Sequence, residues 1–191
     1  MVHEFKSTER LQEEAAYELL FGLEAWLRVP AEHKAETPKR FVKALRQMTE
    51  REEFNFTTFE NEGVEKVDEL IVVGPIPFYT LCAHHVLPFF GQAYVGYVPG
   101  TRIAGLSKFA RAVQWCAKGL WVQETLTQEI ATFLEGELDP EGVAVVLKAE
   151  HLCMAMRGVE VANATTTTSA MRGVFGDHSR TAKAEFLEFI K

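Results

Sequence analysis

The sequence of 191 residues predicts an α+β domain built on an antiparallel sheet. Two helical patterns come first, strand patterns then follow in pairs, and further helical patterns separate and close these pairs. The predicted order is two helices, two strands, two helices, two strands and a last helix. No repeat, linker or low-complexity block divides the chain, so we expect one domain over 1–191, with N-terminal helices over 1–50 and a core over 54–191.

The first 50 residues are expected to be helical. In "TERLQEEAAYELLFGLEAWLRV" an apolar residue recurs every fourth position from Leu11 to Leu27, which is the stripe of an amphipathic helix that ends before Pro30. We expect this stripe to pack on another part of an assembly. A second helix is predicted at "ETPKRFVKALRQM", with Thr37 as its N-cap and Pro38 at the first helical position.

A strand pair and two helices are expected in the middle of the chain. "ELIVVGPIPFY" is rich in β-forming residues and "GQAYVGYVPG" alternates before a Pro-Gly turn, which predicts an antiparallel pair. Ser107 is expected to cap a helix that runs to about Leu120, and "VQETLTQEIATFLEGEL" forms the next helix. The residues expected to face inward on these helices are Phe109, Val113, Cys116, Leu120, Val122, Leu126, Ile130 and Leu134.

The C-terminal part is expected to supply two strands and a closing helix. "GVAVVLKAEHLCMAMRG" is predicted to be one long strand, and the two-residue period of strands then places His151, Cys153 and Arg157 on one side. The threonine-rich "NATTTTSAMRGVF" is the next predicted strand. "SRTAKAEFLEFI" is the predicted last helix.

Charge and hydropathy exclude several classes of protein. The net charge of −7 argues against a chain that follows nucleic acid or an anionic membrane by bulk electrostatics. No apolar run reaches the roughly 18 residues that span a bilayer, and the N-terminus is too acidic and too interrupted for a signal peptide. We therefore expect a cytoplasmic protein with neither nucleic acid nor membrane among its partners.

Cysteine and histidine residues at two places suggest a metal site. The three cysteines without a secretory signal favour metal or catalytic use over disulfides. In "LCAHHVLPFFG", Cys82 and His85 have the C-x-x-H spacing that a turn folds around one ion, and Cys153 is the third candidate ligand for zinc with an open fourth position. Spacing alone leaves Cys82, His84 and His85 as competing ligands. Taken singly, each is more often a core residue, which is the simplest interpretation of Cys116.

Basic residues near a helix start form a candidate anion site. Lys108 and Arg111 lie one turn apart at the beginning of the helix predicted after Ser107, where unpaired N–H groups and the helix dipole favour anions. For an isolated pair, a solvated basic face is the preferred explanation. Arg40 and Arg157 would join the site only if the fold or a neighbouring subunit brings them there.

Five segments in the same order resemble the GTP cyclohydrolase I family. They are "LCAHHVLPFFGQAYVGYVP", "AGLSKFAR", "VQETLTQEI", "HLCMAMRGV" and "ATTTTS", and the resemblance extends from "ETPKR" to "EFLEFI". It implies the tunnelling fold (T-fold), in which the sheets of several subunits join into a barrel. It also implies a homodecamer of two stacked pentamers with active sites at the subunit interfaces.

The resemblance implies a role for each candidate residue. Zinc would be held by Cys82, His85 and Cys153, while His84 and His151 would act as acid/base residues. The remaining roles would be triphosphate binding by Lys108, Arg111, Arg157 and an adjacent subunit's Arg40, guanine recognition by Glu124 with Gln123 beside it, and action of Ser107 near the ribose. The implied reaction opens the imidazole ring of GTP, releases formate, rearranges the ribose and recloses to 7,8-dihydroneopterin triphosphate, the first step of tetrahydrofolate and pterin biosynthesis.

The chain departs from the family at one position of the cysteine-histidine segment. The family usually has a glutamate between the cysteine and the first histidine, and this chain has Ala83. Two alternatives to GTP cyclohydrolase I activity follow. One is a T-fold relative that acts on another purine or pterin, and the other is a protein that binds GTP without turnover.

Overall fold

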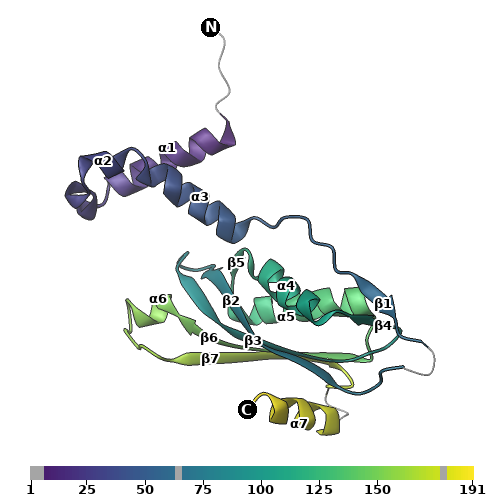
Figure 1. Ribbon diagram of the computed structural model, residues 1–191. Helices are drawn as coiled ribbons and strands as arrows, with labels where there is room; N and C mark the ends of the chain where they lie inside the picture. The colour runs from purple at the N-terminus through teal and green to yellow at the C-terminus, as the bar shows by residue number, and fades with distance from the viewer. Residues whose placement is uncertain (1–6, 63–65, 177–179) are drawn as a thin grey trace. The chain divides into compact units, whose positions relative to one another are not determined.

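The computed structural model describes residues 7–62, 66–176 and 180–191. The chain divides into two compact units, Met1–Glu50 and Arg51–Lys191. Figure 1 shows helices in the first unit and a sheet with helices in the second. No helix of the described residues is long and apolar enough to cross a membrane.

The N-terminal unit consists of α1 (Thr8–Phe21), the 3-10 helix η1 (Glu24–Arg28), α2 (Ala31–Lys34) and α3 (Thr37–Thr49). The predicted first helix is too long, because Gly22, a poor helix former, ends α1 and leaves the last part of the apolar stripe outside it. Four stripe residues, Leu11, Leu19, Leu23 and Leu27, are 51 to 74% exposed, and Ala16 is buried instead.

The predicted start of α3 is wrong by one residue. Glu36 is the N-cap, so Thr37 is already helical and Pro38 occupies the second helical position. The Thr37 hydroxyl donates to the carbonyl of His33 at 2.9 Å. The Thr37 hydroxyl therefore bonds to a residue one turn before it and does not cap α3 as predicted.

The second unit is built on a five-stranded sheet in the order β5-β2-β3-β6-β7. Its strands are β2 (Ile71–Cys82), β3 (Pro88–Val98), β5 (Leu120–Trp121), β6 (Gly142–His151) and β7 (Thr165–Gly173). Neighbouring strands are antiparallel except β5, which pairs with β2 in parallel. A separate ladder joins β1 (Thr58–Glu60) to β4 (Arg102–Ala104). The predicted α+β class and the antiparallel β2–β3 pair are confirmed.

Helices cover both faces of the sheet, with α4 (Leu106–Ala117) and α5 (Gln123–Leu138) on one face and α7 (Arg180–Phe189) on the other (Figure 1). This explains why β6 is apolar at successive positions: Val143 and Val145 pack under α4 and α5, while Ala144 and Val146 pack under α7. Six of the predicted inward helical residues are buried, namely Phe109, Val113, Cys116, Leu126, Ile130 and Leu134.

Three predicted boundaries differ from the structure. Gly105, not Ser107, is the N-cap of α4, and the helix begins at Leu106. It ends at Ala117, so Leu120 lies in β5 and is 51% exposed, contrary to prediction. Val122, predicted as an inward helical residue, is the N-cap of α5 and half-buried.

The predicted long strand is also wrong beyond His151. Leu152–Ala155 forms the short helix α6, closed by a bond from the Met156 N–H to the Leu152 carbonyl at 3.0 Å. Leu, Met and Ala favour helix, which outweighs the strand pattern here. Cys153 and Arg157 therefore do not lie on the face of a strand. In the predicted closing helix, Ser179 lies outside the described residues.

Candidate metal centre and active site

The first half of the site is the tight turn that joins β2 to β3. Backbone bonds close it: the N–H groups of His85 and Val86 donate to the Cys82 carbonyl at 3.3 and 2.8 Å, and the Cys82 N–H donates to the Leu87 carbonyl at 2.8 Å. Val86 has φ of 54°, a left-handed conformation that lets the chain reverse within a few residues. The turn holds the C-x-x-H pair of Cys82 and His85 together.

The second half of the site reaches this turn through strand register. On the antiparallel pair β3–β6, Phe89 lies opposite His151. Moving back from Phe89 towards the turn therefore corresponds to moving forward from His151 into α6. This brings Cys153 beside the turn, and ligand atoms of Cys82, His85 and Cys153 all lie within 4.8 Å of one another.

The donor set suits zinc. Bonds of about 2.3 Å to sulfur and 2.0 Å to nitrogen in a tetrahedron separate ligand atoms by about 3.5–3.8 Å, so a small contraction would close the group around one ion. Two thiolates and one imidazole are ligands typical of zinc, and three protein ligands leave one tetrahedral position for water or substrate. The residues present therefore fit a catalytic type of zinc site.

His84 also lies close to Cys82. The Nδ1 atoms of His84 and His85 are each 3.9 Å from the Cys82 Sγ, while His85 is the histidine grouped with both cysteines. Both histidines are exposed. The grouping favours His85 as the ligand and leaves His84 beside the metal position.

His151, the last residue of β6, is held on two sides. Its ring stacks on Phe89, with centroids 4.5 Å apart and planes 7° apart, and its Nε2 lies 2.7 Å from the Oε1 of Gln123. Gln123 is the first residue of α5 and is buried. Together these contacts fix both the place and the orientation of the imidazole.

The partners of Gln123 determine which nitrogen of His151 carries the proton. The Gln123 Nε2 donates to the Thr166 carbonyl and the Thr168 hydroxyl, each at 3.0 Å, so its Oε1 must face the histidine. The Thr127 hydroxyl donates to the backbone carbonyl of Gln123 at 2.7 Å, and its oxygen lies 2.7 Å from the hydroxyl oxygen of Thr168. An amide oxygen only accepts. Nε2 of His151 is therefore the donor, and Nδ1 of the neutral ring is free to accept a proton.

Burial shifts the pKa of two residues of the site, His151 and Cys153. Burial lowers the pKa of His151, and the carboxylate of Glu124 opposes that shift. Burial also raises the pKa of the Cys153 thiol, and the nearby Cys82 raises it further. A bound cation reverses the preference of a thiol for its proton, because coordination deprotonates it. The third cysteine, Cys116, is buried in the core, where burial raises its pKa to about 12 and keeps it a neutral thiol.

The candidate anion-binding residues do not all lie near the metal group within one chain. Ser107, Lys108 and Arg111 lie in the first two turns of α4, whereas the end of α4 leads through β5 to Cys82. A helix of 12 residues is about 18 Å long. Within one chain, the structure therefore places Ser107 and Lys108 at the far end of α4 from the metal group, and the Lys108 Nζ donates to the Asn55 carbonyl at 2.9 Å.

The remaining predicted residues have different surroundings. Glu124 is exposed at the start of α5 and acts electrostatically on His151, and Arg157 is exposed after α6 and acts on Cys153. Both therefore lie at the metal end of the second unit. Arg40 is exposed on α3 of the first unit.

Sequence reasoning missed the two threonines and the aromatic ring that hold Gln123 and His151. Thr127 carried a usable signal, because it follows Gln123 by four residues on one helix and sits in a buried stripe where a polar side chain needs a partner. The contact of Phe89 with His151 follows from the register of β3 and β6, which sequence periodicity does not give.

Comparison with known proteins identifies the family. The family model described as GTP cyclohydrolase I matches residues 13–191. A protein of Deinococcus radiodurans named GTP cyclohydrolase 1 is 48% identical over 157 residues, covering 81% of this chain and 72% of that protein. Proteins of the same name from Aquifex aeolicus and Mycobacterium avium are 47% and 45% identical over 82% and 98% of this chain, and 83% and 93% of their own lengths.

A crystal structure of the archaeosine synthase QueF-Like in the apo form aligns with 55% of this chain and 92% of its own, at 15% identity and a TM-score of 0.41. The relatives named above are far more similar in sequence, and the family match extends over most of the chain. The chain therefore belongs to the GTP cyclohydrolase I family of enzymes.

Proposed function

We propose that this chain is a zinc-dependent GTP cyclohydrolase I that converts GTP to formate and 7,8-dihydroneopterin triphosphate. The observation that carries the proposal is the Cys82, His85 and Cys153 group, which lies beside two further histidines in a chain of this family. A bound zinc ion would supply a water whose pKa is lowered to about 7, for attack on the imidazole carbon of GTP.

The chain's own groups would manage protons around that attack. We assign His84 and His151 to proton transfer, because neither is needed in the group of three ligands and both lie next to it. In the neutral ring of His151, Nδ1 is the atom able to take up a proton, since Nε2–H is bonded to Gln123. Histidine suits transfer in both directions because its ordinary pKa is near 6.5.

Guanine recognition is assigned to Glu124, whose carboxylate could accept from the ring N–H and the exocyclic amine together. Adenine lacks that pair of donors, so a carboxylate facing it would lose both hydrogen bonds. The position of Glu124 next to Gln123 supports this role, because it places the carboxylate beside the histidine that would act on the same base.

Triphosphate binding points to more than one subunit. Arg157 lies at the metal end, but Lys108 and Arg111 lie in the first two turns of α4, as does Ser107, which would act near the ribose. A neighbouring copy would therefore have to bring its own α4 to this site. Arg40 would come from an adjacent subunit in the same way. This arrangement supports a tunnelling-fold homodecamer with sheets joined into a barrel and active sites at subunit interfaces.

Metal and product analysis on one purified sample would test the proposal. We expect about one zinc per chain, with formate and 7,8-dihydroneopterin triphosphate formed from GTP. A zinc-loaded sample that releases no formate would refute it. A ring-opened product, identified by mass, would indicate the T-fold relative with another reaction, and GTP binding without product, restored by Ala83→Glu, would indicate the binding protein.

Gln123 offers a test of how His151 is positioned. In Gln123→Met we expect kcat to fall by up to about 100-fold with metal content and KM little changed, because His151 loses the acceptor that fixes its ring. Steady-state formate release, measured well below the melting temperature, would check this. Gln128→Met is the matched control, since Gln128 is exposed on the same helix and should leave kcat intact. Equal kcat in both variants would remove Gln123 from the mechanism.

A further inference from the structure

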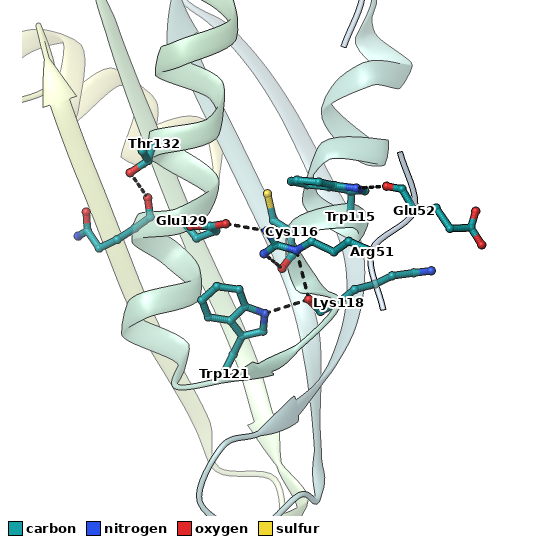
Figure 2. Close-up of polar contacts among 9 residues, drawn as sticks. Arg51, Glu52, Trp115, Cys116, Lys118, Trp121, Glu129 and Thr132 are labelled. Carbon is teal, nitrogen blue, oxygen red and sulfur yellow. Dashed lines mark hydrogen bonds and ion pairs between the residues drawn. The ribbon is translucent and has the colours of Figure 1, made fainter. Parts of the chain in front are cut away.

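Arg51, the first residue of the second unit, lies between two tryptophans (Figure 2). Its guanidinium carbon is 4.5 Å from the ring centroid of Trp115 and 5.4 Å from that of Trp121. Its Nη1 pairs with the Oε1 of Glu129 at 2.9 Å, and the side chain is 26% exposed. Cation–π contacts and a carboxylate thus hold one guanidinium in a fixed plane.

The same guanidinium caps the end of α4. Its Nη2 donates to the Cys116 carbonyl at 3.0 Å and its Nε to the Lys118 carbonyl at 3.4 Å, groups that a helix end leaves unpaired. The indole N–H of Trp121 donates to the same Lys118 carbonyl at 3.4 Å. Arg51 therefore satisfies carbonyl groups both in the last turn of α4 and at the start of segment 118–121.

The segment that Arg51 contacts, 118–121, is bonded to the Cys82–His85 turn. Trp121 pairs with Cys82 in the parallel β5–β2 ladder, and its carbonyl accepts from the Ala83 N–H at 2.9 Å. Gly119 permits the tight course of this segment, because it has φ of +148° and a Cβ there would lie 2.7 Å from the Trp121 indole nitrogen. Trp121 therefore contacts Arg51 through its ring and the turn with the candidate zinc ligand Cys82 through its backbone.

The same segment also leads to His151. Two residues after Trp121 comes Gln123, the partner of His151, and Glu129 on the same helix α5 is the ion-pair partner of Arg51. Arg51 therefore bonds to the chain on both sides of the start of α5. It bonds to the segment that leads into the helix and to the side chain of Glu129 further along it.

We propose that Arg51 is a positioning residue for the active site, acting through segment 118–123 on the Cys82–His85 turn and on the Gln123–His151 pair. The role in turnover rests on the proposed function, whereas the effect on metal affinity rests only on metal binding by the Cys82, His85 and Cys153 group and not on the proposed reaction. The guanidinium touches neither group directly. Its contribution is the alignment of the two halves of the site.

Arg51→Met and Arg51→Lys test this role against a matched control. Met keeps an unbranched stem like that of Arg but loses the guanidinium, with its charge and all its hydrogen bonds. Lys keeps the charge for Glu129 without the planar fork that serves two carbonyls. The control is Arg172→Met, because Arg172 makes a similar set of bonds to α5, to Glu135, Gln128 and Thr132, from β7 at a place remote from His151.

Metal affinity by competition with a chelating dye is the first readout, at a temperature where each variant is shown by circular dichroism to be folded. We expect zinc binding to weaken about 10-fold to 100-fold in Arg51→Met, as for other residues that orient metal ligands, and to weaken measurably in Arg51→Lys. Arg172→Met should lower the melting temperature but bind zinc like the parent chain. Tryptophan emission of the apo protein should shift to the red in Arg51→Met alone.

Turnover is the second readout and separates the two proposals. In zinc-saturated samples, kcat for formate release should fall in both Arg51 variants with KM for GTP little changed. Parental zinc affinity and kcat in folded Arg51→Lys would overturn the positioning role, whether or not Arg51→Met folds. If the parent chain itself releases no formate, the proposed function fails, and the zinc affinities still decide whether Arg51 positions the metal turn.

Discussion

A Cys153→Ala variant is expected to lose zinc and, with it, formate release from GTP. Cys153 supplies one of three ligand atoms that lie within 4.8 Å of one another, and two remaining ligands on one short turn cannot enclose the ion. We expect zinc affinity to fall by more than about 100-fold, beyond the usual effect of residues that only orient ligands. Metal content after dialysis and formate release in the same sample would measure both losses.

Cys116→Ala is the control for that experiment. It makes the same chemical change at a cysteine that is fully buried in the core, with a pKa raised to about 12 by burial, and so removes a neutral thiol. We expect a lower melting temperature with zinc content and turnover unchanged. Zinc retained in Cys153→Ala would contradict the ligand assignment.

The adjacent histidines are expected to separate metal binding from proton transfer. His84→Ala should keep zinc and lose about 10²–10⁴-fold in kcat, the usual contribution of a general acid or base. His85→Ala should lose zinc, because His85 completes the group with both cysteines. Zinc content and kcat measured for the two variants side by side would test this.

The two variants control for each other, since both histidines are exposed and both Nδ1 atoms are 3.9 Å from the same sulfur. Any general disturbance of the turn would therefore affect both alike. The reverse pattern, with zinc lost in His84→Ala and kept in His85→Ala, would exchange their roles. Full activity in His84→Ala would exclude His84 from the mechanism.

Periodicity in the sequence predicts the regular parts of the fold and half of the site. The alternation in β3 and the apolar stripes of α4 and α5 depend on the burial of each residue by itself, so they can be recognised one element at a time. The C-x-x-H pair is equally local. These features give the α+β class, the core and the first two candidate metal ligands.

The features that the sequence left undetermined depend on competition between neighbours or on pairing across the sheet. At Leu152 a strand pattern and helix-forming residues compete, and only the tertiary fold decides between them. Ser107 was predicted to cap α4, but Gly105 is the N-cap. Arg51 is nearly 70 residues from the segment it holds, so nothing local to it indicates its role.

The backbone of Ala83 is held by hydrogen bonds, whereas its side chain is exposed. Its N–H is bonded to Trp121, the turn around it is closed by backbone bonds, and its methyl group is exposed. The geometry of the turn therefore owes little to which residue stands at position 83. For the experimenter, the same property makes position 83 a labelling site, where a spectroscopic probe would lie next to the ligands without replacing any of them.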